Sequence, residues 1–226
     1  MTDVQENFQI VRKKVSNAIS RAHREEGNVG ILIVTKTWPA STIRPLVVTG
    51  HLLFGENRVQ EALEKIAVLP SNLRWHLIGP LQSNKVRKIL PHVEVIESVD
   101  SLDLAQRIDR IAGEMNLHPQ IYLEVNIGAE ASKAGFTPDE IKRDLPAILA
   151  LPHLKVIGLM GIPPYEPDPE QSRPYFRALR LLRDELASIT GHPLPGLSMG
   201  MSHDYEIAIE EGATLVRVGS AIFGER

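Results

Sequence analysis

Residues 29–40 read VGILIVTKTWPA. The run from Val29 to Val34 is apolar and rich in β-branched side chains, which is typical of a buried strand. In an open, doubly wound dinucleotide-binding sheet, a G-x-G-x-x-G turn would follow the first strand. Here Thr35, Lys36 and Thr37 follow instead. The stretch therefore favours a barrel over an open sheet.

The same pattern recurs along the chain. Further predicted strands cover residues 51–55, 74–79, 93–98, 120–127, 154–160, 196–200 and 213–219. An opening helix is predicted over about residues 3–25, and the clearest later helices cover 56–68, 98–116, 137–150 and 172–189. Eight strand–helix units in 226 residues predict an α/β fold, a single (β/α)8 TIM barrel with an extra N-terminal helix. One domain over residues 1–226 is expected, and the open doubly wound sheet is the alternative.

Composition excludes several kinds of function. The net charge of −3 argues against a dedicated nucleic-acid binder. No apolar run is long enough to span a bilayer, and residues 1–15 lack the apolar core of a signal peptide. The chain has no cysteine, so disulfides, a thiol nucleophile and a zinc–thiolate site are excluded. A cytoplasmic protein without a metal centre, and without nucleic-acid or membrane partners, is expected.

Lys36 raises a question because an ammonium group follows a buried strand directly. Burying such a charge is costly unless it is paired, neutralised or used. Active sites of (β/α)8 barrels lie at the carboxyl ends of the strands. Lys36 therefore either extends into water or supplies an amine to a site.

The loops after the seventh and eighth strands provide the second signal. These two loops, with a short extra helix, form a recurrent phosphate site in barrels. Here they carry Ser202, Gly219 and Ser220, whose amides and hydroxyls can approach an anion, and a helix is expected to start near Ala221. Alternatively, these are only turn and cap residues. A lysine beside a phosphate site indicates either a Schiff-base lyase acting on a sugar phosphate or a lysine that holds pyridoxal phosphate (PLP) as an aldimine.

Other rim residues are less distinctive. Arg217 lies two residues before Gly219 on the same strand, and this spacing predicts that its side chain points into the barrel. The alternatives are that Arg217 extends to the solvent at the rim, or that it pairs with Glu56 or Glu206. His76 is predicted to be a hydrogen-bonded packing residue and His203 a loop residue. Lys85 and Lys133 are predicted to be solvated loop lysines; the alternative is that they attract an anionic ligand.

Several long motifs carry a family resemblance. They are VTKT (34–37), FGENRVQE (54–61), WHLIGPLQSNK (75–85), VNIGAEASKAGF (125–136) and the C-terminal stretch from residue 197 to 226. Together they resemble the pyridoxal phosphate homeostasis protein family, whose members are single-barrel relatives of the N-terminal domain of alanine racemase. The resemblance runs from about residue 29 to the end.

The resemblance implies a PLP-binding barrel with no catalytic residues. Lys36 would form the aldimine, and Arg217 would face the pyridine nitrogen. The phosphate cradle would comprise Ser202, Gly219 and Ser220, and Asn57 would line the pocket. The family is understood as a carrier or buffer in intracellular PLP (vitamin B6) homeostasis, so apo PLP-dependent enzymes are candidate recipients.

Two enzyme functions remain as alternatives. One is a weak PLP-dependent racemase or lyase that uses Lys36 as its base, and the other is a Schiff-base aldolase without PLP. Two-base racemisation needs an acid–base group on each face of the cofactor. The four tyrosines, Tyr122, Tyr165, Tyr175 and Tyr205, offer no clear candidate. The second domain of alanine racemase has no counterpart here, which favours a monomer. The role of Trp38 is left open.

Overall fold

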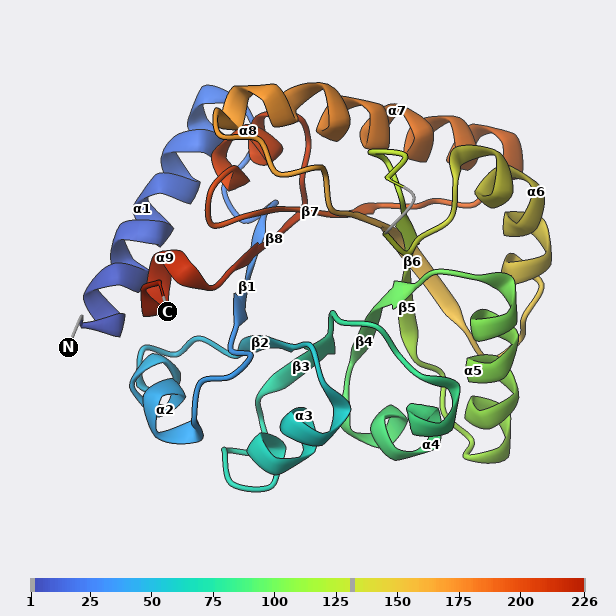
Figure 1. The fold of residues 1–226 in the computed structure, drawn as a ribbon, viewed down its shortest axis with the longest axis horizontal. Helices are drawn as coiled ribbons and strands as arrows, with labels where there is room; N and C mark the ends of the chain where they lie inside the picture. The colour runs from blue at the N-terminus through green and yellow to red at the C-terminus, as the bar shows by residue number, and fades with distance from the viewer. Residues whose placement is uncertain (1–2, 131–132, 226) are drawn as a thin grey trace.

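Eight parallel strands form a closed barrel in the computed structural model, which describes residues 3–130 and 133–225. Each strand pairs with the next along the chain, and the eighth pairs with the first (Figure 1). The strands are β1 (Gly30–Val34), β2 (Leu53–Glu56), β3 (Arg74–Leu77), β4 (Val95–Val99), β5 (Gln120–Val125), β6 (Lys155–Gly161), β7 (Gly196–Met201) and β8 (Leu215–Val218). The predicted TIM barrel and its eight strands are confirmed.

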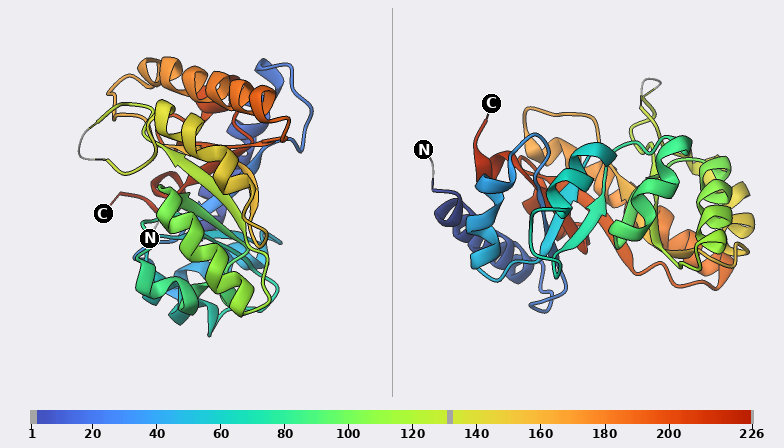
Figure 2. Two further views of the ribbon diagram at one scale, coloured as in Figure 1. Left: turned by 90° about the vertical axis from the view of Figure 1, so that its right-hand side faces the viewer. Right: turned by 90° about the horizontal axis from the view of Figure 1, so that it is seen from below.

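Helices surround the strands in all three views (Figures 1 and 2). They are α1 (Val4–Arg21), α2 (Ala40–Val48), α3 (Val59–Ile66), α4 (Val86–Ile89), α5 (Leu102–Glu114), α6 (Pro138–Leu149), α7 (Arg173–Thr190), α8 (Tyr205–Glu210) and α9 (Ser220–Phe223). Short 3-10 turns cover Ser83–Lys85, Leu90–His92 and Pro169–Ser172. The extra N-terminal helix is confirmed as α1.

The helices predicted over 3–25, 56–68 and 98–116 are all shorter than expected. The one predicted over 56–68 covers only Val59–Ile66, because Glu56 still belongs to β2. The helix predicted over 98–116 begins at Leu102, because Ser98 and Val99 complete β4 and the Ser101 hydroxyl accepts the Leu104 amide as an N-cap. The helix predicted over 3–25 ends at Arg21, and the left-handed φ of 52° at His23 turns the chain away. Local capping, not hydrophobic periodicity, sets these last two boundaries.

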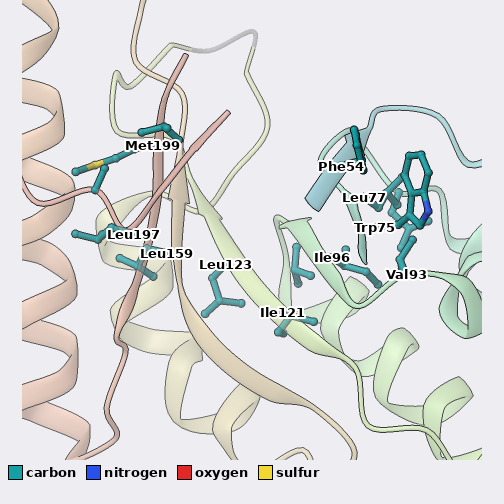
Figure 3. Packing of buried hydrophobic residues seen from close by; sticks show 14 of the residues in the cluster. Phe54, Trp75, Leu77, Val93, Ile96, Ile121, Leu123, Leu159, Leu197 and Met199 are labelled. Carbon is teal, nitrogen blue, oxygen red and sulfur yellow. The ribbon is translucent and has the colours of Figure 1, made fainter. Parts of the chain in front are cut away.

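Alternation along the strands separates two packed regions. Outward-facing strand side chains meet the helices in the main core, where Figure 3 shows Phe54, Trp75, Leu77, Ile96, Ile121, Leu123, Leu159, Leu197 and Met199. A second, smaller cluster comprises Val95, Tyr122 and Met160. On alternate positions of β4, β5 and β6, these three face the barrel interior.

Two glycines allow the Tyr122 ring to fit inside the barrel. A Cβ on Gly196 would lie 2.6 Å from Tyr122 Cε1, and one on Gly158 would lie 2.1 Å from the Gly196 carbonyl oxygen. Only glycine permits this approach of β6 to β7. Tyr122 therefore fills the lumen on that side of the barrel.

Helix α1 packs the N-terminal part of the chain against its C-terminal part. Its buried face, comprising Phe8, Val11, Val15, Ala18 and Ile19, belongs to the main core, and Asn7 Nδ2 donates to the Ile222 carbonyl oxygen at 2.9 Å. Figure 1 shows α1 beside α8 and α9, with both termini on the same side of the molecule.

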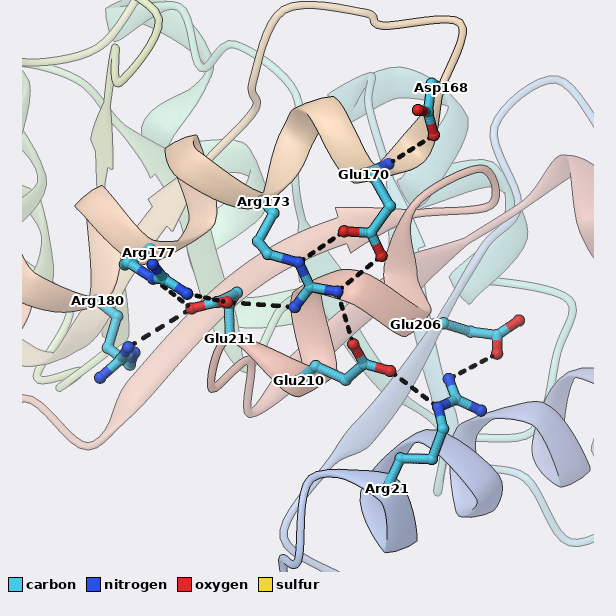
Figure 4. Close-up of polar contacts among 9 residues, drawn as sticks. All are labelled: Arg21, Asp168, Glu170, Arg173, Arg177, Arg180, Glu206, Glu210 and Glu211. Carbon is cyan, nitrogen blue, oxygen red and sulfur yellow. Dashed lines mark hydrogen bonds and ion pairs between the residues drawn. The ribbon is translucent and has the colours of Figure 1, made fainter.

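A surface ion-pair network covers this junction (Figure 4). Arg21 pairs with Glu206 at 3.0 Å and with Glu210 at 2.9 Å, and Arg173 pairs with Glu210 at 2.8 Å. Arg173, Arg177 and Arg180 all reach Glu211. The network ties α1 and α7 to α8.

Candidate functional site

A cavity of about 480 Å³ opens at the carboxyl ends of the strands. It is lined by Val34, Lys36, Trp38, Asn57, Ile78, Ile162, Met201, Ser202, His203, Arg217, Gly219, Ser220, Gly224 and Glu225. All six residues predicted to contact a ligand are among them: Lys36, Asn57, Ser202, Arg217, Gly219 and Ser220. The barrel thus gathers residues that are up to 184 positions apart, from 36 to 220, around one space.

Lys36 begins the turn that follows β1. Thr35 is fully buried, whereas Lys36 is exposed and lines the cavity. The apparent cost of a buried ammonium group is therefore avoided, because the chain leaves the barrel wall between these two residues. The Lys36 side chain lies at the cavity.

Ser202 joins the two loops predicted to bind an anion. Its Oγ accepts the amide N–H groups of Gly219 and Ala221, both at 3.1 Å. Helix α9 begins at Ser220, close to the predicted start. The first amides of a helix have no intrahelical acceptor. Donors left for an anion are therefore the Ser220 amide and the hydroxyls of Ser202 and Ser220.

Arg217 points into the barrel, as predicted. Its side chain is buried and donates to Ser198 Oγ at 2.6 Å and to the Gly161 carbonyl oxygen at 3.0 Å. Neither alternative pairing, with Glu56 or with Glu206, is formed: Glu56 pairs with Lys65 and Glu206 with Arg21. The guanidinium lines the floor of the cavity in a fixed orientation.

Behind Arg217 lies a chain of buried polar groups, termed here the interior network: His76, Glu97, Ser198 and Arg217. Ser198 Oγ donates to Glu97 Oε2 at 2.5 Å, and Glu97 Oε1 lies 2.6 Å from His76 Nδ1, which therefore carries a proton. The prediction that His76 is a hydrogen-bonded packing residue is confirmed. Sequence reasoning did not identify Glu97 or Ser198.

The charged groups inside the barrel shift one another's pKa values. Burial lowers the pKa of Arg217, and the carboxylates of Glu97 and Glu124 oppose that shift. Burial alone would raise the pKa of Glu97, but the hydrogen bond and charge of His76, with the charge of Arg217, hold it below its usual range. Burial and the nearby Asp100 raise the pKa of Glu124 to about 7. The interior thus stabilises a cation at Arg217 through the Glu97 carboxylate.

Asn57 is held at the cavity by a close backbone approach. A Cβ on Gly79 would lie 2.3 Å from the Asn57 carbonyl oxygen. The loop after β3 can therefore approach Asn57 this closely only because residue 79 is a glycine. Asn57 Oδ1 is buried and has no hydrogen-bond partner among the described residues. Since an unpaired buried acceptor is costly, it is suited to a donor brought by a ligand or an ordered water.

Trp38 and His203 are among the eight described cavity-lining residues that were not assigned to the site from sequence. Trp38 stacks on Phe223, with ring centroids 5.3 Å apart, and so forms part of the cavity wall. His203, predicted to be only a loop residue, also lines the cavity. Its Nε2 lies 3.0 Å from the Glu166 carbonyl oxygen, which requires that nitrogen to carry a proton. No spacing in the sequence distinguishes either residue from an ordinary loop residue.

The prediction that Lys133 is simply a solvated lysine is wrong. It is half-buried, pairs with Glu130 and donates to the Pro163 carbonyl oxygen at 3.1 Å. These contacts connect the loop after β5 to the loop after β6. Ala131 and Ser132 of the same motif lie outside the described residues.

The described residues offer neither a metal-binding cluster nor a membrane-spanning helix. No three His, Asp or Glu side chains in ranges 3–130 and 133–225 gather in a way that could hold a metal ion. Among the same residues, no helix combines the length and apolarity that a bilayer span requires.

Comparison with known proteins places the chain in a family. Residues 5–226 match the model of the alanine racemase N-terminal domain. A curated relative from Aquifex aeolicus, named pyridoxal phosphate homeostasis protein, is 46% identical over 222 residues, covering 98% of this chain and 97% of the relative. A Pseudomonas aeruginosa relative of the same name is 43% identical over 229 residues, covering 100% and 97%.

A solved structure agrees with these matches. PipY of Synechococcus elongatus, with PLP bound, is 39% identical, has a TM-score of 0.82, and covers 93% of this chain and 100% of PipY. The motifs and the fold therefore lead to the same assignment, and the chain belongs to the pyridoxal phosphate homeostasis protein family, within the wider group defined by the alanine racemase N-terminal domain.

Proposed function

We propose that this protein binds PLP covalently through Lys36 and acts as a cytoplasmic, monomeric carrier or buffer of the cofactor. The observation that carries the proposal is the convergence of an amine, a guanidinium and a group of anion-binding donors on one 480 Å³ cavity. PLP has matching parts: an aldehyde, a pyridine nitrogen and a phosphate. The PLP-bound structure of PipY, at 39% identity, supports the same ligand here.

The described residues fit PLP part by part. The Ser220 amide and the hydroxyls of Ser202 and Ser220 would hold the phosphate, with Gly219 lining the cavity beside them and its amide bonded to Ser202 Oγ. Arg217 would donate to the pyridine nitrogen. The orphaned Asn57 Oδ1 would accept a hydrogen bond from the ligand or from a water beside it. When bound, PLP supplies an aldehyde that condenses with the Lys36 amine: a C=N bond forms to Nζ and one water leaves.

The setting of Arg217 disfavours strong catalysis. A guanidinium is a permanent donor, so it keeps the pyridine nitrogen unprotonated and weakens the ring as an electron sink. The interior network holds Arg217 in that role through Ser198 and Glu97. None of the four tyrosines is among the cavity-lining residues that the structure describes. Both features favour a carrier over a two-base racemase.

A labelling experiment tests covalent binding. The purified protein is incubated with PLP, its visible spectrum is recorded, and the complex is reduced with borohydride and mapped by peptide mass spectrometry. We expect a yellow chromophore and a label on Lys36. Absence of the chromophore, or a label confined to another lysine, would overturn the proposal.

Lys36→Ala separates the covalent bond from the cradle. We expect loss of the label at position 36 but retention of measurable PLP affinity, because the phosphate donors remain. The matched control is Lys88→Ala, an exposed lysine on α4 outside the cavity. If Lys36→Ala abolishes all affinity in equilibrium dialysis, the cradle contributes less than proposed.

Two further assays separate a carrier from an enzyme. Incubation with single-enantiomer amino acids in deuterated water reports exchange of the α-proton, and exchange at catalytic rates would support a racemase or lyase that uses Lys36 as base. Transfer of PLP to an apo PLP-dependent enzyme, faster than release of PLP into buffer, would support the carrier.

A further inference from the structure

The segment that carries Lys36 is held on its N-terminal side by a second lysine. Lys65, on α3, is 6% exposed, and its Nζ donates to the Thr35 carbonyl oxygen at 2.7 Å. The same Nζ donates to Glu56 Oε1 at 2.5 Å and to Glu61 Oε1 at 2.7 Å. An ammonium group has three N–H donors, and here each has an acceptor. We call Thr35, Glu56, Glu61 and Lys65 the Lys65 cluster.

The cluster also holds the C-terminal side of Lys36. The backbone N–H of Thr37 donates to Glu61 Oε1, the same oxygen that pairs with Lys65. Thr37 has a φ of 65°, in the left-handed region that a β-branched residue rarely adopts. Such a conformation persists only where its surroundings impose it. Here the surroundings are the turn closed by the Trp38 amide, which donates to the Thr35 carbonyl oxygen at 3.0 Å, and the Glu61 carboxylate, which accepts from the Thr37 amide.

The two connections come from one rigid element and enclose a single residue. Glu61 and Lys65 are one turn apart on α3, and Glu56 is the last residue of β2. Thr35 Oγ1 adds a hydrogen bond of 2.5 Å to Glu56 Oε1. The peptide groups on both sides of Lys36 are thereby fixed, whereas its exposed side chain extends from between them.

We propose that Lys65 and Glu61 are positioning residues that aim the Lys36 amine into the cavity by clamping the backbone at Thr35 and Thr37. The proposal rests on the proposed function, because it assigns the clamp to covalent PLP binding at Lys36. It also separates the roles of the two lysines: the Lys65 amine is saturated by protein acceptors and is a structural cation. The competing interpretation is that the cluster only fastens α3 to the barrel.

Glu61→Ala is the most informative variant. The Glu61 side chain is 20% exposed, so its removal deletes the Thr37 acceptor without opening the core. Glu61→Gln retains an oxygen acceptor and serves as the rescue variant. Glu64→Ala is the matched control, since Glu64 is exposed on the same helix and bonded to Gln60.

Lys65 is tested with a double variant. Lys65→Met alone is avoided because it would leave the buried Glu56 carboxylate without a cation. Lys65→Met/Glu56→Gln removes both charges.

Two readouts are used. In PLP-free protein, NMR hydrogen exchange at the Thr37 amide reports whether the clamp is formed. With PLP, quenching by borohydride at timed intervals gives the rate of covalent trapping at Lys36. We expect Glu61→Ala to accelerate Thr37 exchange and to slow trapping about tenfold, with rescue in Glu61→Gln and no change in Glu64→Ala. The Lys65→Met/Glu56→Gln variant is expected to slow trapping as well.

The outcomes distinguish the two proposals. If the wild-type protein is not trapped at Lys36, the proposed function fails, and the positioning role fails with it even if Thr37 exchange responds. If the wild type is trapped and Glu61→Ala is trapped at the same rate, the proposed function stands and the positioning role is overturned. Equal slowing in Glu61→Ala and Glu64→Ala would also overturn it, because a general loss of negative charge would then explain the effect.

Discussion

The interior network and the surface ion-pair network contain arginine and glutamate side chains in very different surroundings. Inside the barrel, Glu97 is 0% exposed and Arg217 4% exposed, and their charges are linked through Ser198. On the surface, the Arg21 and Arg177 side chains are 49% and 58% exposed. Water reaches these two arginines, and the buried Glu211 of the surface network keeps two cations when one is removed. In the barrel interior neither water nor a second partner replaces a lost one, so the cost of breaking a pair differs greatly. Only the interior network also fixes a cavity residue.

Glu97→Ala should produce the largest effect. It leaves the buried Arg217 guanidinium without its nearest carboxylate and should cost about 3–5 kcal/mol of unfolding free energy, measured by urea denaturation. PLP binding should weaken as well, because Arg217 is no longer held by Ser198 and Glu97.

Glu97→Gln provides the control for charge. It keeps the shape and an oxygen acceptor for Ser198 but removes the negative charge. The loss of unfolding free energy is therefore expected to lie between that of Glu97→Ala and zero. If Glu97→Ala lowers the unfolding free energy by less than about 1 kcal/mol, the interior network is no more costly to break than an exposed ion pair. The difference between the two networks would then not exist.

Glu124 is expected to make the stability depend on pH. Its pKa is raised to about 7 by burial and by Asp100, with Arg217 opposing the shift. A raised carboxyl pKa favours the protonated form in the folded state, so this contribution to stability is complete below the ordinary pKa and is lost as pH rises towards and through 7. Between pH 5 and pH 8, Glu124 should therefore cost the wild type about 1–3 kcal/mol.

Glu124→Gln should remove that loss. Urea denaturation at pH 5, 6, 7 and 8 would show it as a flatter curve than that of the wild type, with Glu64→Gln on exposed α3 as the control. Parallel curves for Glu124→Gln and the wild type would mean that Glu124 does not titrate in this range.

The fold and the ligand-facing residues could be predicted from sequence because both depend on local signals. Runs such as GILIV mark the strands, and in a closed barrel the loops that follow parallel strands converge at one end. Lys36, Ser202 and Ser220 were therefore predicted to lie together without any knowledge of side-chain contacts, and the structure places all three at the cavity.

The supporting residues could not be predicted in the same way. Glu97 stands between Ile96 and Ser98 in VEVIES. A polar residue at such a position of a strand is compatible with a side chain facing solvent and with one facing a barrel lumen. Lys65 and Glu61 look like an ordinary i,i+4 pair on an exposed helix face. Their contacts with residues 35 and 37 depend on where the fold places α3 relative to the turn after β1, which no local pattern encodes.

Arg177→Ala should produce the smallest effect. Arg177 shares Glu211 with Arg173 and Arg180, so two cations remain after its removal. A loss of about 0.5 kcal/mol or less is expected at low salt, declining further at high salt because exposed charges are screened. PLP binding should be unaffected, since the network lies outside the cavity. A loss above about 1.5 kcal/mol would contradict this, because it would show that even the exposed charges of α7 belong to a network as costly to break as the interior one.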